Sequence, residues 1–130
     1  MKRSTRSGLV AAALTTVMTA ALVAVPATAA QAAAKTCSIS TNGRYCQTQP
    51  PHLQAVRGAI LITAWPPNIP GASVTCSAYD SITGALVGSV TSPFGITRDK
   101  LIGGLTNSYY LFCVRSATGW PGGGGGRIEN

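Results

Sequence analysis

The sequence of 130 residues predicts an all-β protein, a small antiparallel β-sandwich or Greek key of about six strands with two disulfides. Beyond residue 34, short runs of alternating, branched or aromatic residues are separated by turn residues. No apolar pattern of helical period occurs in that part of the chain. All four cysteines also lie there, and an even number in a short exported chain is typical of a disulfide framework: Cys37, Cys46, Cys76 and Cys113.

Residues 1–34 have the three parts of a secretory signal peptide. Three basic residues come first, an apolar stretch follows at 9–25, and small residues lead to overlapping Ala-x-Ala cleavage sites that end at Ala29, Ala32 and Ala34. The sequence does not choose among these sites. A transmembrane anchor is the alternative, but threonines within the apolar stretch and the alanine tract favour cleavage. We therefore expect a secreted, extracellular protein with no stable membrane association after cleavage.

Cleavage after Ala34 leaves 96 residues, the size of one domain with a thin core. Seven basic and three acidic residues give this part a net charge of +4. The cations are scattered and form no basic run, so the charge favours general solubility and no nucleic-acid partner is expected. We expect a disulfide-bonded β domain at 35–118 and a flexible Gly-rich tail at 119–130, whose five glycines, 122–126, need not pack.

The first predicted strand, residues 36–40, runs into Asn42-Gly43, a strong hairpin signal, and residues 44–46 lead out of that turn. Two consecutive prolines then interrupt pairing, because proline lacks the backbone donor. The next strand region is 55–64. Its continuous apolar run at 60–62 suggests a strand that is covered on both faces.

A proline-rich loop at 65–71 separates this region from residues 73–79, whose strict alternation of apolar and polar side chains marks a half-buried strand. After a turn that begins at Asp80, two further strands are predicted at 85–91 and 96–102, the second with a weaker pattern. Residues 108–115 form the clearest strand because they are rich in aromatic and branched side chains.

The four cysteines allow three pairings. We favour Cys37–Cys46 with Cys76–Cys113, since the first pair brackets a short turn and the second could join two strands. In the chain-entropy description, closing separations of 9 and 37 residues removes about 2.6 and about 3.8 kcal/mol of unfolded-state entropy, so the longer bridge should matter more. No Cys-x-x-Cys spacing occurs and the chain has one histidine, so neither a metal site nor a cofactor is expected.

Catalytic groups are scarce, whereas acid–base and nucleophilic catalysis both need paired groups. His52 lies in a proline-bounded loop, and Asp80 begins a turn whose backbone it can cap. Asp99 lies between Arg98 and Lys100, which compensate its charge. We therefore predict no catalytic residues and a protein that is not an enzyme.

Arg44 and Tyr45 are the candidate binding residues, at the tip of a turn that a Cys37–Cys46 bridge would close. A turn fixed in this way has lost its ordering entropy before a partner arrives. Arginine offers bidentate donors to carboxylates, and tyrosine offers a stiff contact surface. On these local residues alone, the more frequent arrangement is a solvated Arg44 and a Tyr45 that covers the bridge.

Two segments resemble the secreted actinobacterial α-amylase inhibitors of the tendamistat type: residues 101–104 leading to 109–113, and residues 74–78 around the third cysteine. That family has a signal peptide, a six-stranded β-sandwich and disulfides joined first-to-second and third-to-fourth. Its inhibitory Trp-Arg-Tyr motif corresponds here to Gly43-Arg44-Tyr45, with glycine in place of tryptophan. The resemblance spans residues 37 to 114. It implies a monomer whose Arg44 and Tyr45 block the cleft of a glycoside hydrolase, an α-amylase.

Residues 104–114 also resemble the tyrosine-bearing F strand of fibronectin type III domains. A sandwich of that kind, carrying Trp65, Trp120 and exposed tyrosines, could bind cell-wall or other extracellular polysaccharide. The alternative is that these aromatic residues fill the core.

Overall fold

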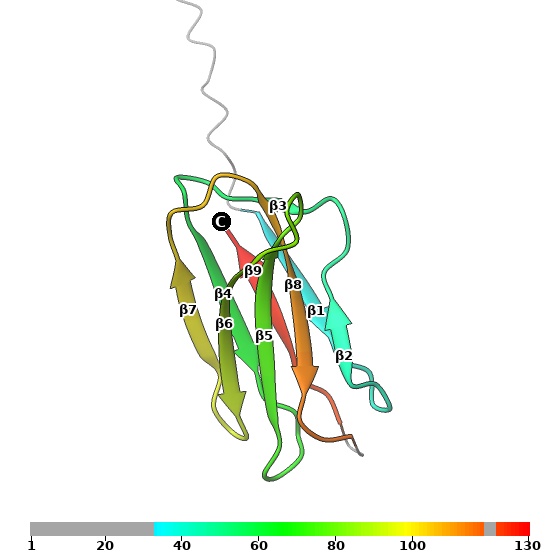
Figure 1. The fold of residues 1–130 in the computed structure, drawn as a ribbon. Helices are drawn as coiled ribbons and strands as arrows, with labels where there is room; N and C mark the ends of the chain where they lie inside the picture. The colour runs from blue at the N-terminus through cyan, green and yellow to red at the C-terminus, as the bar shows by residue number, and fades with distance from the viewer. Residues whose placement is uncertain (1–32, 119–121) are drawn as a thin grey trace, which may run out of the picture.

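The computed structural model describes residues 33–118 and 122–130; most of the expected signal peptide, together with Trp120, lies outside these ranges. The described residues form two antiparallel sheets that face each other, which confirms the predicted all-β sandwich (Figure 1). They contain nine strands where about six were expected: β1 (Ala34–Ser38), β2 (Tyr45–Gln47), β3 (Leu53–Gln54), β4 (Ile60–Trp65), β5 (Ser73–Asp80), β6 (Leu86–Pro93), β7 (Arg98–Ile102), β8 (Ser108–Arg115) and β9 (Gly125–Glu129).

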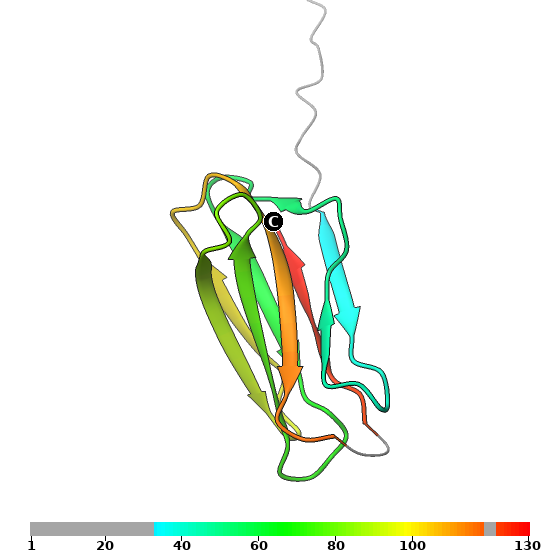
Figure 2. The same ribbon diagram turned by 45° about the vertical axis from the view of Figure 1, so that its right-hand side comes forward.

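The first sheet has the strand order β1-β9-β4-β7, and the second sheet has the order β2-β8-β5-β6, with β3 also pairing with β8. The two layers are visible when the molecule is turned (Figure 2). No helix among the described residues is long and apolar enough to cross a membrane.

The core lies between the two sheets and is built by side chains that alternate along β4, β5 and β8. Leu61 is only half-buried and faces outward. The prediction that the apolar run of β4 is covered on both faces is therefore wrong. Leu101, which lies opposite Leu61 on the neighbouring strand β7, is exposed, so this outer face is open to solvent there. The inner positions of the three strands are Ile60, Ile62, Ala64, Val74, Cys76, Ala78, Tyr109, Leu111 and Cys113.

Both disulfides join the predicted pairs, Cys37–Cys46 and Cys76–Cys113. Cys76 and Cys113 lie directly opposite each other on the neighbouring strands β5 and β8, and both are fully buried. The longer bridge therefore crosses the centre of the second sheet, whereas the shorter one connects β1 in the first sheet to β2 in the second.

The hairpin predicted at Asn42-Gly43 is wrong as a strand pairing. The chain does turn there, since Gly43 N donates to Ser40 O at 2.9 Å, but β1 pairs with β9 and β2 pairs with β8. The turn thus carries the chain from one sheet to the other. Turn residues specify a reversal of direction, whereas the choice of partner strand is made by packing elsewhere in the fold.

The flexible tail expected at 119–130 is wrong for residues 122–130. Gly125–Glu129 form β9, which lies inside the first sheet between β1 and β4 (Figure 1). A Cβ at Gly126 would lie 2.6 Å from Cys113 Sγ, and one at Gly125 would lie 2.9 Å from the Trp65 ring. This strand passes between the core disulfide and the Trp65 indole, where only glycine fits, so the glycine run is a packing feature.

The turn after β5 is capped by Asp80, as the sequence predicts. Asp80 Oδ1 accepts hydrogen bonds from the backbone N–H groups of Ile82 and Thr83, at 2.8 and 3.1 Å. Asn107 Nδ2 donates to Oδ2 at 2.8 Å. The Asn107 hydrogen bond, with those from the two backbone groups, holds the pKa of Asp80 below its ordinary value against the opposing effect of burial.

Candidate binding site

The segment between β1 and β2 is fixed at several points, and we call residues 39–46 the braced turn (Figure 2, lower right). The Cys37–Cys46 disulfide closes its base. Ile39 N donates to Gly124 O at 2.9 Å, and Arg115 N donates to Arg44 O at 2.9 Å. Together with the Ser40–Gly43 hydrogen bond, these contacts hold the turn to both sheets.

Arg115 supports the braced turn from below. Arg115 is the last residue of β8, faces inward and is only 1% exposed. Its Nη2 donates to Thr41 O at 2.6 Å. Nη1 donates to Gly123 O at 3.4 Å, and a Cβ at Gly122 would lie only 2.9 Å from this nitrogen. The buried guanidinium therefore joins the turn to the glycine segment through backbone carbonyls.

Sequence reasoning missed Arg115 as part of this site. The signal was present in the alternation of β8, because residue 115 has the same parity as the buried Tyr109, Leu111 and Cys113. An arginine at an inward position needs buried acceptors, and Thr41 O of the braced turn and Gly123 O of the glycine segment accept from its two terminal nitrogens.

Arg44 and Tyr45 both point outward. Tyr45 is 66% exposed, so it does not cover the Cys37–Cys46 bridge, and Arg44 is also exposed. The guanidinium of Arg44 has no ion pair within the described part of the chain. The backbone of these residues is thus held while both side chains remain exposed to a partner.

Tyr45 also begins an aromatic row on the outer face of the second sheet, formed by Tyr45, Phe112, Tyr110 and Tyr79. The Tyr45 and Phe112 rings are 5.5 Å apart, and the Tyr79 and Tyr110 rings stack at 5.5 Å. The His52 ring lies 5.3 Å from Tyr110. These residues come from four different segments. The tyrosines and Phe112 share one face because the pairing of β2 and β5 with β8 places the outward positions of the three strands side by side.

Paired hydroxyl groups lie beside the aromatic row on the same face. Thr75 Oγ1 and Thr91 Oγ1 are 2.9 Å apart, and Ser77 Oγ and Ser89 Oγ are 2.8 Å apart, each pair bridging β5 and β6. The outer face of the second sheet therefore combines aromatic rings with hydroxyl groups.

The candidate titratable groups are distributed over separate elements. His52 lies between β2 and β3, Asp80 ends β5, and Asp99 lies in β7 of the other sheet. No hydrogen bond joins any two of them in the described residues. Three cysteine sulfur atoms lie within 4.8 Å of one another, but all belong to disulfides and offer no thiolate to a metal.

The fold and these contacts define a small β-sandwich with two disulfides, one at its centre and one at the base of an exposed turn. Comparisons with known protein families and with curated proteins find no match to this chain.

Proposed function

We propose that this chain is a secreted, non-catalytic binding protein that recognises an extracellular protein through Arg44 and Tyr45. The observation that carries the proposal is the braced turn, whose backbone is fixed while these two side chains are exposed. Binding through such a turn costs little ordering entropy. Arginine and tyrosine are also among the residues that most often dominate binding energy at protein interfaces.

The partner that these side chains suit best is an enzyme cleft lined by carboxylates and aromatic rings, and α-amylase is the candidate. Arg44 would pair with acidic groups of the cleft, while the Tyr45 ring would lie where a sugar ring otherwise binds. The protein would act as a monomer that obstructs the cleft, with no chemistry of its own. The resemblance of Gly43-Arg44-Tyr45 to the inhibitory motif of the tendamistat type also supports this target.

Titration of α-amylase with the purified protein tests the proposal. We expect inhibition at micromolar protein, and we expect Arg44→Ala and Tyr45→Ala each to weaken it by about thirtyfold, the effect of losing a dominant contact. Lys100→Ala removes another exposed cation, on β7, and should leave inhibition unchanged. Full amylase activity at micromolar protein would refute this target.

The aromatic row favours a second candidate function, the binding of an extracellular polysaccharide. Apolar faces of sugar rings pack on aromatic side chains, and the neighbouring hydroxyl pairs offer hydrogen bonds to sugar hydroxyl groups. This candidate uses the outer face of the second sheet, whereas the first uses the exposed turn.

Retention on insoluble glycans separates the two candidates. If the aromatic row binds glycan, the protein will be retained on cellulose, chitin or starch, and Tyr79→Ala will reduce retention about tenfold because it removes half of the stacked pair. Arg44→Ala should then behave as wild type on the polymer. The reverse pattern, with no retention and amylase inhibition that is insensitive to Tyr79→Ala, would exclude the glycan function.

Secretion is consistent with the two disulfides, which indicate an oxidising compartment. Among the three predicted cleavage sites, we favour those after Ala29 and Ala32 over the one after Ala34. Ala34 is the first residue of β1, and Ala33 exchanges hydrogen bonds with Asn130 through its N–H and C=O groups. A cut after Ala34 would remove these contacts, whereas a cut after Ala29 or Ala32 would keep them.

A further inference from the structure

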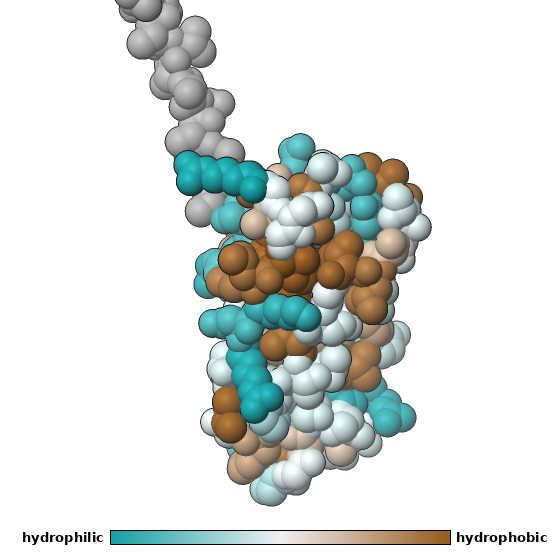
Figure 3. Space-filling view, turned by 60° about the vertical axis from the view of Figure 1, so that its left-hand side comes forward, coloured by the Kyte–Doolittle hydropathy of each residue, from teal (hydrophilic) through white to brown (hydrophobic). Residues whose placement is uncertain are grey.

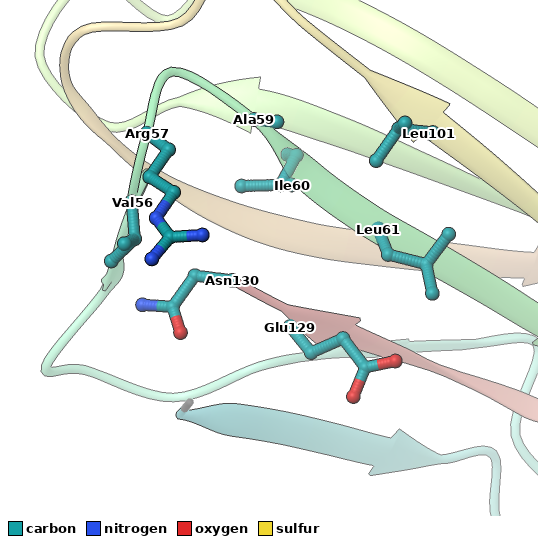
Figure 4. Close-up of a pocket in the computed structure, with 8 residues that line it drawn as sticks. All are labelled: Val56, Arg57, Ala59, Ile60, Leu61, Leu101, Glu129 and Asn130. Carbon is teal, nitrogen blue, oxygen red and sulfur yellow. The ribbon is translucent and has the colours of Figure 1, made fainter. Parts of the chain in front are cut away.

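A recess of about 330 Å³ lies on the outer face of the first sheet (Figure 4), and no residue of the braced turn lines it. Its volume is within the range of small-molecule sites in proteins. The turn before β4, the outward side chains of β4 and β7, and the end of β9 surround it. It shares no residue with the binding function proposed above.

The floor of the recess is apolar. Leu61 and Leu101 lie opposite each other on β4 and β7, and Leu101 is 70% exposed. Val56 extends this surface from the preceding turn. In the view turned towards the β7 side, apolar side chains gather in the upper part of the face and are bordered by hydrophilic ones (Figure 3). The recess is thus open to a ligand that buries an apolar group.

The rim of the recess carries the guanidinium of Arg57, which extends towards Asn130 (Figure 4). Arg57 has a φ of +56°, a left-handed conformation that glycine adopts more readily. The turn is held by hydrogen bonds from Ala59 N to Val56 O at 3.2 Å and from Leu105 N to Gly58 O at 2.9 Å. Strained backbone conformations are concentrated at functional sites, so the left-handed φ of Arg57 suggests a function for its side chain.

Arg57 has no ion pair among the described residues, although a carboxylate lies nearby. Glu129 also lines the recess, but its Oε2 pairs with Arg127 Nη2 at 2.8 Å, which compensates its charge. Asn130 is held in place because its Nδ2 donates to Gln54 O at 2.9 Å and its Oδ1 accepts from Ala33 N at 2.7 Å. Among the residues that line the recess, Arg57 is therefore the cation without an ion pair in the described part of the chain.

From the apolar floor and the unpaired guanidinium, we infer that this recess binds a small amphipathic anion, a carboxylate with an apolar tail. The tail contacts Leu61, Leu101 and Val56, and Arg57 binds the carboxylate through charge-assisted hydrogen bonds. The anionic head group distinguishes this ligand from a neutral apolar molecule of the same length.

The test is a titration of the purified, oxidised protein with octanoate and, in parallel, with 1-octanol, followed by NMR chemical shifts. We expect octanoate to bind at least tenfold more tightly than 1-octanol. Arg57→Gly suits the left-handed turn and removes the guanidinium but none of the apolar contacts of Leu61, Leu101 and Val56, so it should weaken octanoate binding about tenfold and leave 1-octanol binding unchanged. Leu101→Ser should weaken the binding of both probes.

Lys100→Ala, which removes a neighbouring cation outside the recess, is the matched control and should bind octanoate as wild type does. Thermal unfolding of Arg57→Gly should show a melting temperature no lower than that of wild type, which separates loss of binding from loss of fold. Equal affinities for the two probes, octanoate binding that survives Arg57→Gly, or no shifts at 10 mM octanoate would each overturn the inference.

Discussion

Replacing Gly126 by alanine is expected to lower the free energy of unfolding by about 3 kcal/mol, the upper end of the range for overpacked cores. The new Cβ would lie 2.6 Å from Cys113 Sγ and 2.8 Å from Leu111 Cδ2, and it would press against Cys76 Sγ. These sulfur atoms are bonded to each other across two paired strands, so they cannot move aside as a flexible side chain would.

Urea unfolding of Gly126→Ala and Gly103→Ala provides the matched comparison. Gly103 is exposed and has no left-handed φ, and a Cβ added there would meet no atom within 4 Å. Gly103→Ala should therefore change stability by no more than about 0.5 kcal/mol. If the two variants were equally stable, β9 would not pass beside the core disulfide.

The strands that the sequence predicted best are those whose own side chains alternate. The strands predicted at 73–79 and 108–115 correspond to β5 and β8 with nearly the predicted bounds. Their alternation of buried and exposed positions can be recognised from the local sequence alone. Both disulfides were also predicted, since one brackets a short turn and the other joins two recognisable strands.

The predictions that failed depended on contacts between distant parts of the chain. Glycine runs have no side chains and suggest flexibility, yet Gly125 O lies 3.4 Å from Cys76 Sγ, 49 residues away in the sequence. Nothing near the glycine run shows that a disulfide and an indole will occupy its two sides. The pairing of β1 with β9 was unpredictable for the same reason, because the hairpin signal at Asn42-Gly43 is local.

The candidate site was predictable only in part. Arg44 and Tyr45 were identified from their place beside a disulfide, and the structure leaves both exposed. The aromatic row was harder to predict, since it needs the register between β2, β5 and β8 as well as the alternation within each strand. Composition does not determine a strand register, whereas the packed core does.

The glycine segment connects the core to the braced turn. At one end, Gly126 packs beside the Cys76–Cys113 bridge, and Gly124 O accepts the hydrogen bond from Ile39 N. At the other end, Gly122 leaves room for Arg115, which holds Thr41. A change that displaces this segment should therefore affect both the stability of the core and the rigidity of the proposed binding turn.

Removing the two disulfides one at a time should separate these two effects. Cys76→Ala/Cys113→Ala should destabilise the protein by at least about 4 kcal/mol, because it releases the longer loop and also truncates two fully buried side chains. Cys37→Ala/Cys46→Ala should cost about 2.6 kcal/mol, the value for a separation of 9 residues. For a domain with a total stability of about 5–15 kcal/mol, the first loss is the more damaging.

Urea unfolding measures the free energy of unfolding that each variant loses. Target binding, measured at a low temperature at which each variant remains folded, shows how each loss affects the braced turn. The variant without Cys37–Cys46 should lose more target affinity than the variant without Cys76–Cys113, although it retains more stability, because only the shorter bridge closes the base of the braced turn. A greater stability loss on removal of the shorter bridge would contradict the chain-entropy ranking. Equal target affinity in the two variants would show that bracing by the Cys37–Cys46 bridge does not contribute to recognition.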